Sequence, residues 1–135
     1  MNFKSQGTEK RLLKLKEVAE TYFDSLRKQQ FEAIPYDDNA TLRAPLTAGG
    51  VNRPIAGKQT LYNEWWQALE PALRGVTIRI LGHYIHENLE GIITEAEITL
   101  AGPNVTLRVA DRFTVNENGK ITEQENHFDP RAVTG

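Results

Sequence analysis

The first part of the chain has apolar residues at the three- and four-residue spacing of one helix face. These residues are Leu12, Leu15, Ala19, Tyr22 and Leu26, with Val18 and Phe23 beside them. The spacing predicts an amphipathic helix over about residues 8–29. A short helical turn is expected at Phe31–Ile34, and Pro35 ends it because proline has no N–H for the helix ladder.

Two further segments precede a change of period. The string YDDNATLRAP predicts a turn into a short strand that Pro45 closes. Residues 46–57 are rich in glycine and proline and form the one long irregular segment that the pattern predicts, which in a small domain is often a functional lid or rim. A second helix is predicted from about Lys58 to Leu69, before Pro71 interrupts it.

After Gly75 the apolar residues follow a period of two. The alternating sets are Val76, Ile78 and Ile80; Ala96, Ile98 and Leu100; and Val105, Leu107, Val109, Phe113 and Val115. They predict half-buried strands of an antiparallel sheet, separated by the turn-forming strings NLEG, AGPN and NENG, with KITEQENHF as the last strand. Helices first and strands last predict an α+β domain whose N-terminal helices pack on a curved antiparallel sheet.

Composition narrows the class of protein. A chain of 135 residues is expected to form one domain over 1–135. Its 16 basic and 18 acidic residues show no basic excess, so no nucleic-acid partner is expected. Without a signal-like N-terminus or a long apolar run, we expect a cytoplasmic protein with no membrane partner. The lack of cysteine excludes disulfides, thiolate metal sites and cysteine nucleophiles.

Asp111 is the charged residue on an otherwise apolar strand face. It shares that face with Leu107, Val109 and Phe113, so its carboxylate is expected to point to the interior. Burial raises the pKa of a carboxyl group, and this can make a general acid or base near neutral pH. The alternative is that Asp111 pairs with a neighbouring arginine or lies at a solvated rim. Phe113 is a candidate contact for a bound molecule.

Tyr22 and two tryptophans are the aromatic candidates. Tyr22 lies on the buried helix stripe, and a buried phenol can donate a hydrogen bond to a developing oxyanion. The alternative is a core tyrosine whose hydroxyl is already satisfied. Trp65 and Trp66 are adjacent on a helix and are predicted to point in different directions, one at the core or a cavity and one at an interface. Trp65 is the candidate binding residue, although core packing is the more frequent use of such a residue.

The three histidines do not predict a metal site. His83 and His86 are three residues apart on a strand, so alternation places them on opposite faces, and His127 lies on another strand. We therefore expect no metal and no cofactor. Tyr84 and His86 share the parity of Ile78 and are candidates to reach a pocket, with a solvated strand end as the alternative.

The last strand offers a polar tip for a cavity. Gln124, Asn126 and Phe128 share one face, with Asn126 as a hydrogen-bonding group and Phe128 as an apolar contact. Glu95 and Glu97 look like a catalytic pair of carboxylates, but both lie on the polar side of their strand, which predicts a solvated face. The sequence contains no GxSxG, GxGxxG, HExxH or phosphate-binding loop.

The order of elements, the string FEAIPYDDNATLRAP and the ending NGKITEQENHFDP resemble the NTF2-like superfamily, in particular its SnoaL-like and ketosteroid-isomerase-like branches. The resemblance covers about residues 10–130. It implies an NTF2-like, or cystatin-like, cone of helices on a curved sheet that encloses an apolar pocket, commonly in a homodimer.

The resemblance also assigns family positions. Tyr22 matches the oxyanion-hole tyrosine of ketosteroid isomerases, but Ala44 stands where their base lies and Val109 where their second acid lies. In limonene-epoxide-hydrolase-like members a catalytic aspartate matches Asn126, which is an amide here. Neither of those two mechanisms is therefore expected in its family form.

Two hypotheses of different class follow. The first is a small-molecule enzyme without cofactor, an isomerase, cyclase, dehydratase or hydrolase acting on an apolar organic molecule, with Asp111 as acid or base and Tyr22 as hydrogen-bond donor. The second is a non-catalytic binding or dimerisation module that keeps the pocket but has lost the acid–base set. Loss of the acids at Ala44 and Val109 favours the second hypothesis.

Overall fold

The computed structural model describes residues 3–134, and the side chains of residues 6–134. Six strands form one sheet in the order β2-β1-β6-β5-β4-β3. The strands are β1 (Tyr36–Arg43), β2 (Ile55–Ala56), β3 (Thr77–Ile85), β4 (Gly91–Leu100), β5 (Val105–Val115) and β6 (Ile121–His127). The four consecutive strands β3, β4, β5 and β6 and the turns between them lie where the period-two pattern predicts them.

The sheet differs from the prediction in one pairing. Neighbouring strands are antiparallel except β1 and β6, which pair in parallel with Leu42 opposite Gln124. Strand β1 lies beside the last strand, β6, and not beside β3. The parallel pair brings Tyr36 of β1 within hydrogen-bond distance of Gln124 on β6.

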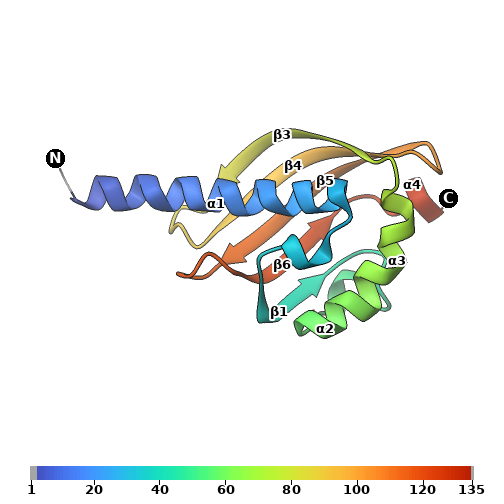
Figure 1. Ribbon diagram of the computed structural model, residues 1–135, viewed down its shortest axis with the longest axis horizontal. Helices are drawn as coiled ribbons and strands as arrows, with labels where there is room; N and C mark the ends of the chain where they lie inside the picture. The colour runs from blue at the N-terminus through green and yellow to red at the C-terminus, as the bar shows by residue number, and fades with distance from the viewer. Residues whose placement is uncertain (1–2, 135) are drawn as a thin grey trace.

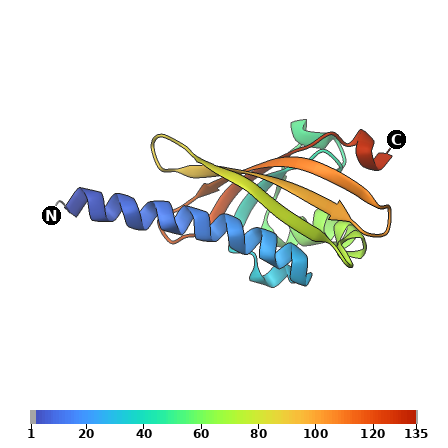
Figure 2. The same cartoon turned by 90° about the horizontal axis from the view of Figure 1, so that it is seen from above.

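Helix α1 (Phe3–Lys28) packs along one face of the sheet, and its N-terminal end extends beyond the strands (Figure 1). Figure 2 shows the twist of the sheet over this helix. Four of the five residues of the predicted stripe, Leu15, Ala19, Tyr22 and Leu26, are at most 2% exposed, and Leu12 is half-buried. The helix starts earlier than expected because residues 6–10 are all exposed, and so offer no apolar period to detect.

The second helical segment runs from Lys58 to Leu73. It consists of α2 (Lys58–Leu61), a π-helical turn η3 (Tyr62–Trp66), α3 (Gln67–Leu69) and a 3₁₀ turn η4 (Glu70–Leu73). Pro71 does not stop it, because it lies at the start of the last turn, where its N–H is not needed. Among the described residues, no helix is long and apolar enough to cross a membrane.

Three short elements complete the fold. A 3₁₀ turn η1 (Phe31–Ala33) follows α1 as predicted, and α4 (Arg131–Thr134) follows β6. Residues 46–57 are less irregular than expected, because they contain the 3₁₀ turn η2 (Gly50–Asn52) and strand β2. Strand β2 pairs with β1, so this loop is held at the edge of the sheet.

Candidate functional site

A cavity of about 210 Å³ lies between the inner face of the sheet, α1 and the 58–73 helical segment. Its apolar lining residues are Leu26, Ala44, Leu46, Trp65, Ala68, Leu69, Ala72, Leu73, Ile98, Leu100, Leu107, Val109, Phe128 and Val133. Leu46 and Val133 are 49% and 42% exposed and mark its mouth. Its polar lining residues are Tyr22, Thr47, Glu64, Asp111 and Asn126.

Asp111 lines this cavity from the middle of β5. Its position follows from the strand alternation, which turns Leu107, Val109 and Asp111 to the same inner face. The residue is 2% exposed, and its Oδ1 atom is buried without a hydrogen-bond partner. Burial raises the pKa of this carboxyl group to about 8. The alternative interpretation was that Asp111 pairs with a neighbouring arginine. Its Oδ1 atom has no such partner.

Tyr22 reaches the same cavity from α1 and is 2% exposed. Burial raises the pKa of its phenol well above 10, and the nearby carboxylate of Asp111 raises it further. Hydrogen bonds from the side chains of Gln124 and Asn126 act in the opposite direction. The ring lies nearly parallel to that of Trp65, with centroids 6.4 Å apart. The phenol is therefore neutral over the physiological pH range.

Asn126 and Gln124 supply the polar tip from β6. Asn126 lies directly opposite Asp111 in the β5–β6 ladder, so the two side chains leave the same face of the sheet. Gln124 donates from Nε2 to Oδ1 of Asn126 over 2.8 Å and accepts from the hydroxyl of Tyr36 over 2.5 Å. Sequence reasoning missed Tyr36, because only the β1–β6 pairing brings it to this face.

Of the other predicted binding residues, Trp65, Asn126 and Phe128 line the cavity. Phe113 does not. It is fully buried behind Tyr22, with ring centroids 5.0 Å apart in an edge-on contact. It shares the inner face as expected, but the ring of Tyr22 lies against it.

The placement of Tyr84 and His86 in a pocket is wrong. Tyr84 is 56% exposed and donates to Glu95 on the outer face, and His86 is exposed beyond the end of β3. The reason is an irregularity in β3, where the register with β4 shifts between Ile80 and Gly82. An extra residue at that point reverses the parity, so residues that follow it point to the opposite face.

The expectation for the two tryptophans is half correct. Trp65 faces the cavity, but Trp66 is 1% exposed and does not reach an interface. The chain's own η1 turn covers it, since the ring of Phe31 lies 5.5 Å from that of Trp66.

The remaining charged candidates lie away from the cavity. Glu97 pairs with Arg79 and Arg108 on the outer face, as the solvated-face interpretation predicts. His83 contacts Thr94 and Glu20 instead of a second histidine. Among residues 3–134, no group of three or more metal-ligating side chains is close enough to hold an ion.

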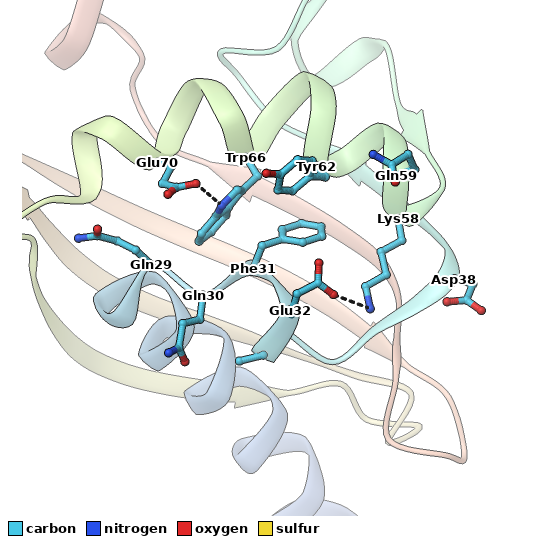
Figure 3. A pocket seen from close by; sticks show the side chains of 11 residues that line it. Gln29, Gln30, Phe31, Glu32, Asp38, Lys58, Gln59, Tyr62, Trp66 and Glu70 are labelled. Carbon is cyan, nitrogen blue, oxygen red and sulfur yellow. Dashed lines mark hydrogen bonds and ion pairs between the residues drawn. The ribbon is translucent and has the colours of Figure 1, made fainter.

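A second hollow, open to solvent, lies between the 58–73 segment and residues 29–33 (Figure 3). Its aromatic floor is Phe31, Tyr62 and Trp66. Two of its carboxylates already have partners, since Trp66 donates to Glu70 over 2.9 Å and Lys58 pairs with Glu32. The inner cavity, with an unpartnered buried carboxyl group, is therefore the stronger candidate site.

We compared the sequence and the structure with those of known proteins. No protein-family model and no curated protein matches the sequence. Several solved structures do match. One, described as an epoxide hydrolase/cyclase-like enzyme, SalBIII, in pyran ring formation in the polyether salinomycin, has a TM-score of 0.72 at 19% identity, covering 94% of this chain and 96% of that chain.

Two further matches have lower sequence identity. A SnoaL-like protein of unknown function from Burkholderia thailandensis matches with a TM-score of 0.71 at 13% identity, over 87% of this chain and 95% of that one. A steroid delta-isomerase from Pseudomonas aeruginosa matches with a TM-score of 0.65 at 13% identity, over 90% and 86%. Others are described as NTF2-like or as having a cystatin-like fold. This chain therefore has the fold of the NTF2-like superfamily, an α+β arrangement of an N-terminal helix on a curved six-stranded sheet.

Proposed function

We propose that this protein binds a small apolar organic molecule in the inner cavity and carries out acid–base chemistry on it without a cofactor. The observation that carries the proposal is the carboxyl group of Asp111, which is buried, lacks a partner at Oδ1 and lines an otherwise largely apolar cavity. Evolution rarely keeps such a group in a core unless it has a use, because a buried unpartnered polar atom costs stability.

Asp111 is the proposed proton donor or acceptor. With a pKa of about 8 the carboxyl group is mostly protonated at neutral pH and can give a proton to a bound molecule, then take one back. Tyr22 is the proposed hydrogen-bond donor to oxygen that gains negative charge. The reaction class is isomerisation, cyclisation, dehydration or hydrolysis, and the descriptions of the SalBIII and steroid delta-isomerase structures support such chemistry on this fold.

The size of the cavity supports a compact substrate. Pockets for drug-sized ligands occupy roughly 300–1,000 Å³, and this cavity is smaller at about 210 Å³. Trp65, Phe128 and Val133 would contact the apolar part of the molecule. The polar end would lie toward Asp111, Tyr22 and Asn126.

Exchange of α-hydrogens for deuterium tests the proposal without knowledge of the natural substrate. We would incubate the protein with bicyclic ketones such as camphor in D₂O and follow exchange by NMR. The protein should accelerate exchange, and Asp111→Asn should lower the rate by about 100-fold or more. Glu95→Gln, which alters a carboxylate on the outer face of β4, is the matched control and should leave the rate unchanged.

A second candidate function, a binding module without turnover, is favoured by a different observation. Ala44 and Val109 stand at the family's acid positions, and both line the cavity as apolar wall. If camphor binds to wild-type protein and to Asp111→Asn equally, and neither accelerates exchange, the enzymatic proposal is wrong and the binding module is supported.

We also propose a homodimer formed through the outer face of the sheet. Tyr84 and Ile93 are paired across β3 and β4 and are 56% and 39% exposed in the single chain. A second copy would cover them. Light scattering should give twice the mass of the chain, and Ile93→Lys should give the monomer mass. The cytoplasmic location stays a prediction.

A further inference from the structure

Three buried polar side chains form a hydrogen-bonded series that ends at the cavity. Tyr36 of β1, Gln124 of β6 and Asn126 of β6 are 3%, 2% and 6% exposed. The hydroxyl of Tyr36 donates to Oε1 of Gln124, and Nε2 of Gln124 donates to Oδ1 of Asn126. Of the three, only Asn126 lines the cavity.

Each hydrogen bond of the series is donated in the direction from Tyr36 toward Asn126, and Tyr36 fixes that direction. A carboxamide has an oxygen that only accepts and a nitrogen that only donates, so its orientation depends on its neighbours. The buried phenol of Tyr36 needs an acceptor for its proton, and Oε1 of Gln124 is that acceptor. The NH₂ group of Gln124 therefore faces Asn126, whose own oxygen is occupied and whose NH₂ group remains to donate.

Tyr22 lines the same cavity as Asn126. The side chains of Gln124 and Asn126 lower the pKa of the Tyr22 phenol against the effect of burial. A phenol whose oxygen accepts from a neighbouring amide keeps its own proton available for another acceptor. Because Tyr22 lines the cavity, that proton is available to a bound molecule.

We propose that Tyr36, acting through Gln124, is a positioning residue that holds Asn126 and Tyr22 as hydrogen-bond donors, so that the cavity selects apolar molecules with an acceptor oxygen, such as ketones. The inference rests on the proposed function for the location of the site. It adds the chemical class of the ligand and two residues that the ligand does not touch. The protonated carboxyl group of Asp111 is a third donor at the same end.

A pair of matched probes tests the inference. Camphor and camphene are bicyclic compounds of similar shape, and only camphor carries an oxygen. NMR titration of the wild-type protein should show camphor binding about tenfold more tightly than camphene, the ratio expected for one net hydrogen bond. Tyr36→Phe should remove most of that preference through weaker camphor binding, while camphene binding changes less than twofold.

Two controls separate positioning from a structural effect. Tyr84→Phe removes a phenol that lies on the outer face of the sheet, away from the cavity, and donates to Glu95, and it should leave both affinities unchanged. Gln124→Met removes the amide while keeping a side chain of similar length, and it should abolish the preference even if Tyr36→Phe does not fold. A structural role alone would weaken both probes together, so equal losses of camphor and camphene binding overturn the inference.

The remaining outcomes also decide. Equal binding of both probes to wild-type protein, or no binding of either, overturns the assignment of an acceptor oxygen. One combination of results separates the two proposals. If Tyr36→Phe and Gln124→Met abolish the camphor preference, the inference is supported. If deuterium exchange is also unchanged in Asp111→Asn, the enzymatic proposal is contradicted. The failures of the two proposals are thus distinguishable.

Discussion

Asp111 and Asn126 lie directly opposite each other on β5 and β6, and both side chains line one end of the cavity. The pairing brings a carboxyl group with a pKa of about 8 beside an amide whose oxygen is already occupied. An acid and a fixed donor in a largely apolar cavity are what acid–base chemistry on a carbonyl compound requires. The predictions below test the parts of this arrangement separately.

The pH dependence of stability should report Asp111. Its pKa rises from 3.8 to about 8 on folding, so between these values the folded protein holds one more proton than the unfolded chain. Stability from this group is therefore full below about pH 4 and is lost as pH rises toward 8, by at most about 1.4 kcal/mol per pH unit. The side chain of the Asp111→Asn variant cannot ionise. In urea unfolding, the free energy of unfolding of this variant should therefore rise relative to that of wild type as the pH increases from about 4 to 8.

Other titrating groups near Asp111 should not mimic this profile. The pKa values of Tyr22 and Tyr36 are raised well above 10, so both phenols stay neutral in the window. Glu64 lines the cavity and pairs with Arg53 at 3.6 Å. Glu64→Gln, made in wild type and in Asp111→Asn, measures the contribution of Glu64 to the pH dependence of stability. An Asp111→Asn curve parallel to wild type from pH 4 to pH 8 contradicts the assignment.

Filling the cavity should abolish ligand binding without unfolding the protein. Val109 is 6% exposed and its side chain forms part of the cavity wall. In Val109→Phe the larger ring enters the cavity, so the cost of overpacking, normally about 1–3 kcal/mol, should be small. Camphor titration should show at least a tenfold loss of affinity. Thr106→Phe, on the outer face of the same strand, should bind camphor as wild type does.

Arg11 should hold the two hairpin ends of the sheet to α1. Its guanidinium donates to the backbone oxygens of Leu89, Val115 and Asn116, at 2.9, 2.5 and 3.0 Å. Arg11→Met leaves these half-buried carbonyls without that partner and should lower the free energy of unfolding by about 2 kcal/mol. Urea denaturation measures the loss. Lys16→Met, at an exposed position on the same helix, should change stability by less than about 0.5 kcal/mol.

Gly91 should not tolerate a methyl group. A Cβ at this position would lie 2.4 Å from the carbonyl oxygen of Phe113 on β5, closer than real contacts allow. Gly91→Ala must therefore move the backbone of β4 or β5 and should destabilise the protein by about 1–3 kcal/mol. Thermal unfolding measures it. Gly102→Ala, at a turn with no atom within 4 Å of the added Cβ, is the control and should have little effect.

Local pattern accounts for most of the elements. The stripe of α1 and the alternation of β4 and β5 follow from periods of 3.6 and 2, and these patterns alone place Tyr22 and Asp111 on buried faces. The start of α1 escaped prediction because exposed polar residues show no period. The helix beyond Pro71 escaped it because proline at the start of a turn needs no N–H.

The errors at the site have one kind of cause. Tyr84 and His86 were placed by parity, and a single register shift in β3 reversed it. Phe113 was placed on the correct face, but it lies behind the ring of Tyr22. Alternation along a strand predicts the face of the sheet on which a side chain lies. It does not predict which other side chains pack against it.

The sequence by itself determined the α+β class, the absence of thiol chemistry and the burial of Asp111 and Tyr22, because these depend on composition and on neighbours along the chain. Only the tertiary structure decided that Tyr36 approaches Gln124, since the parallel pairing of β1 with β6 joins residues 88 positions apart. It also decided that Asp111 lacks a partner at Oδ1. Such facts depend on long-range packing, which no local period encodes.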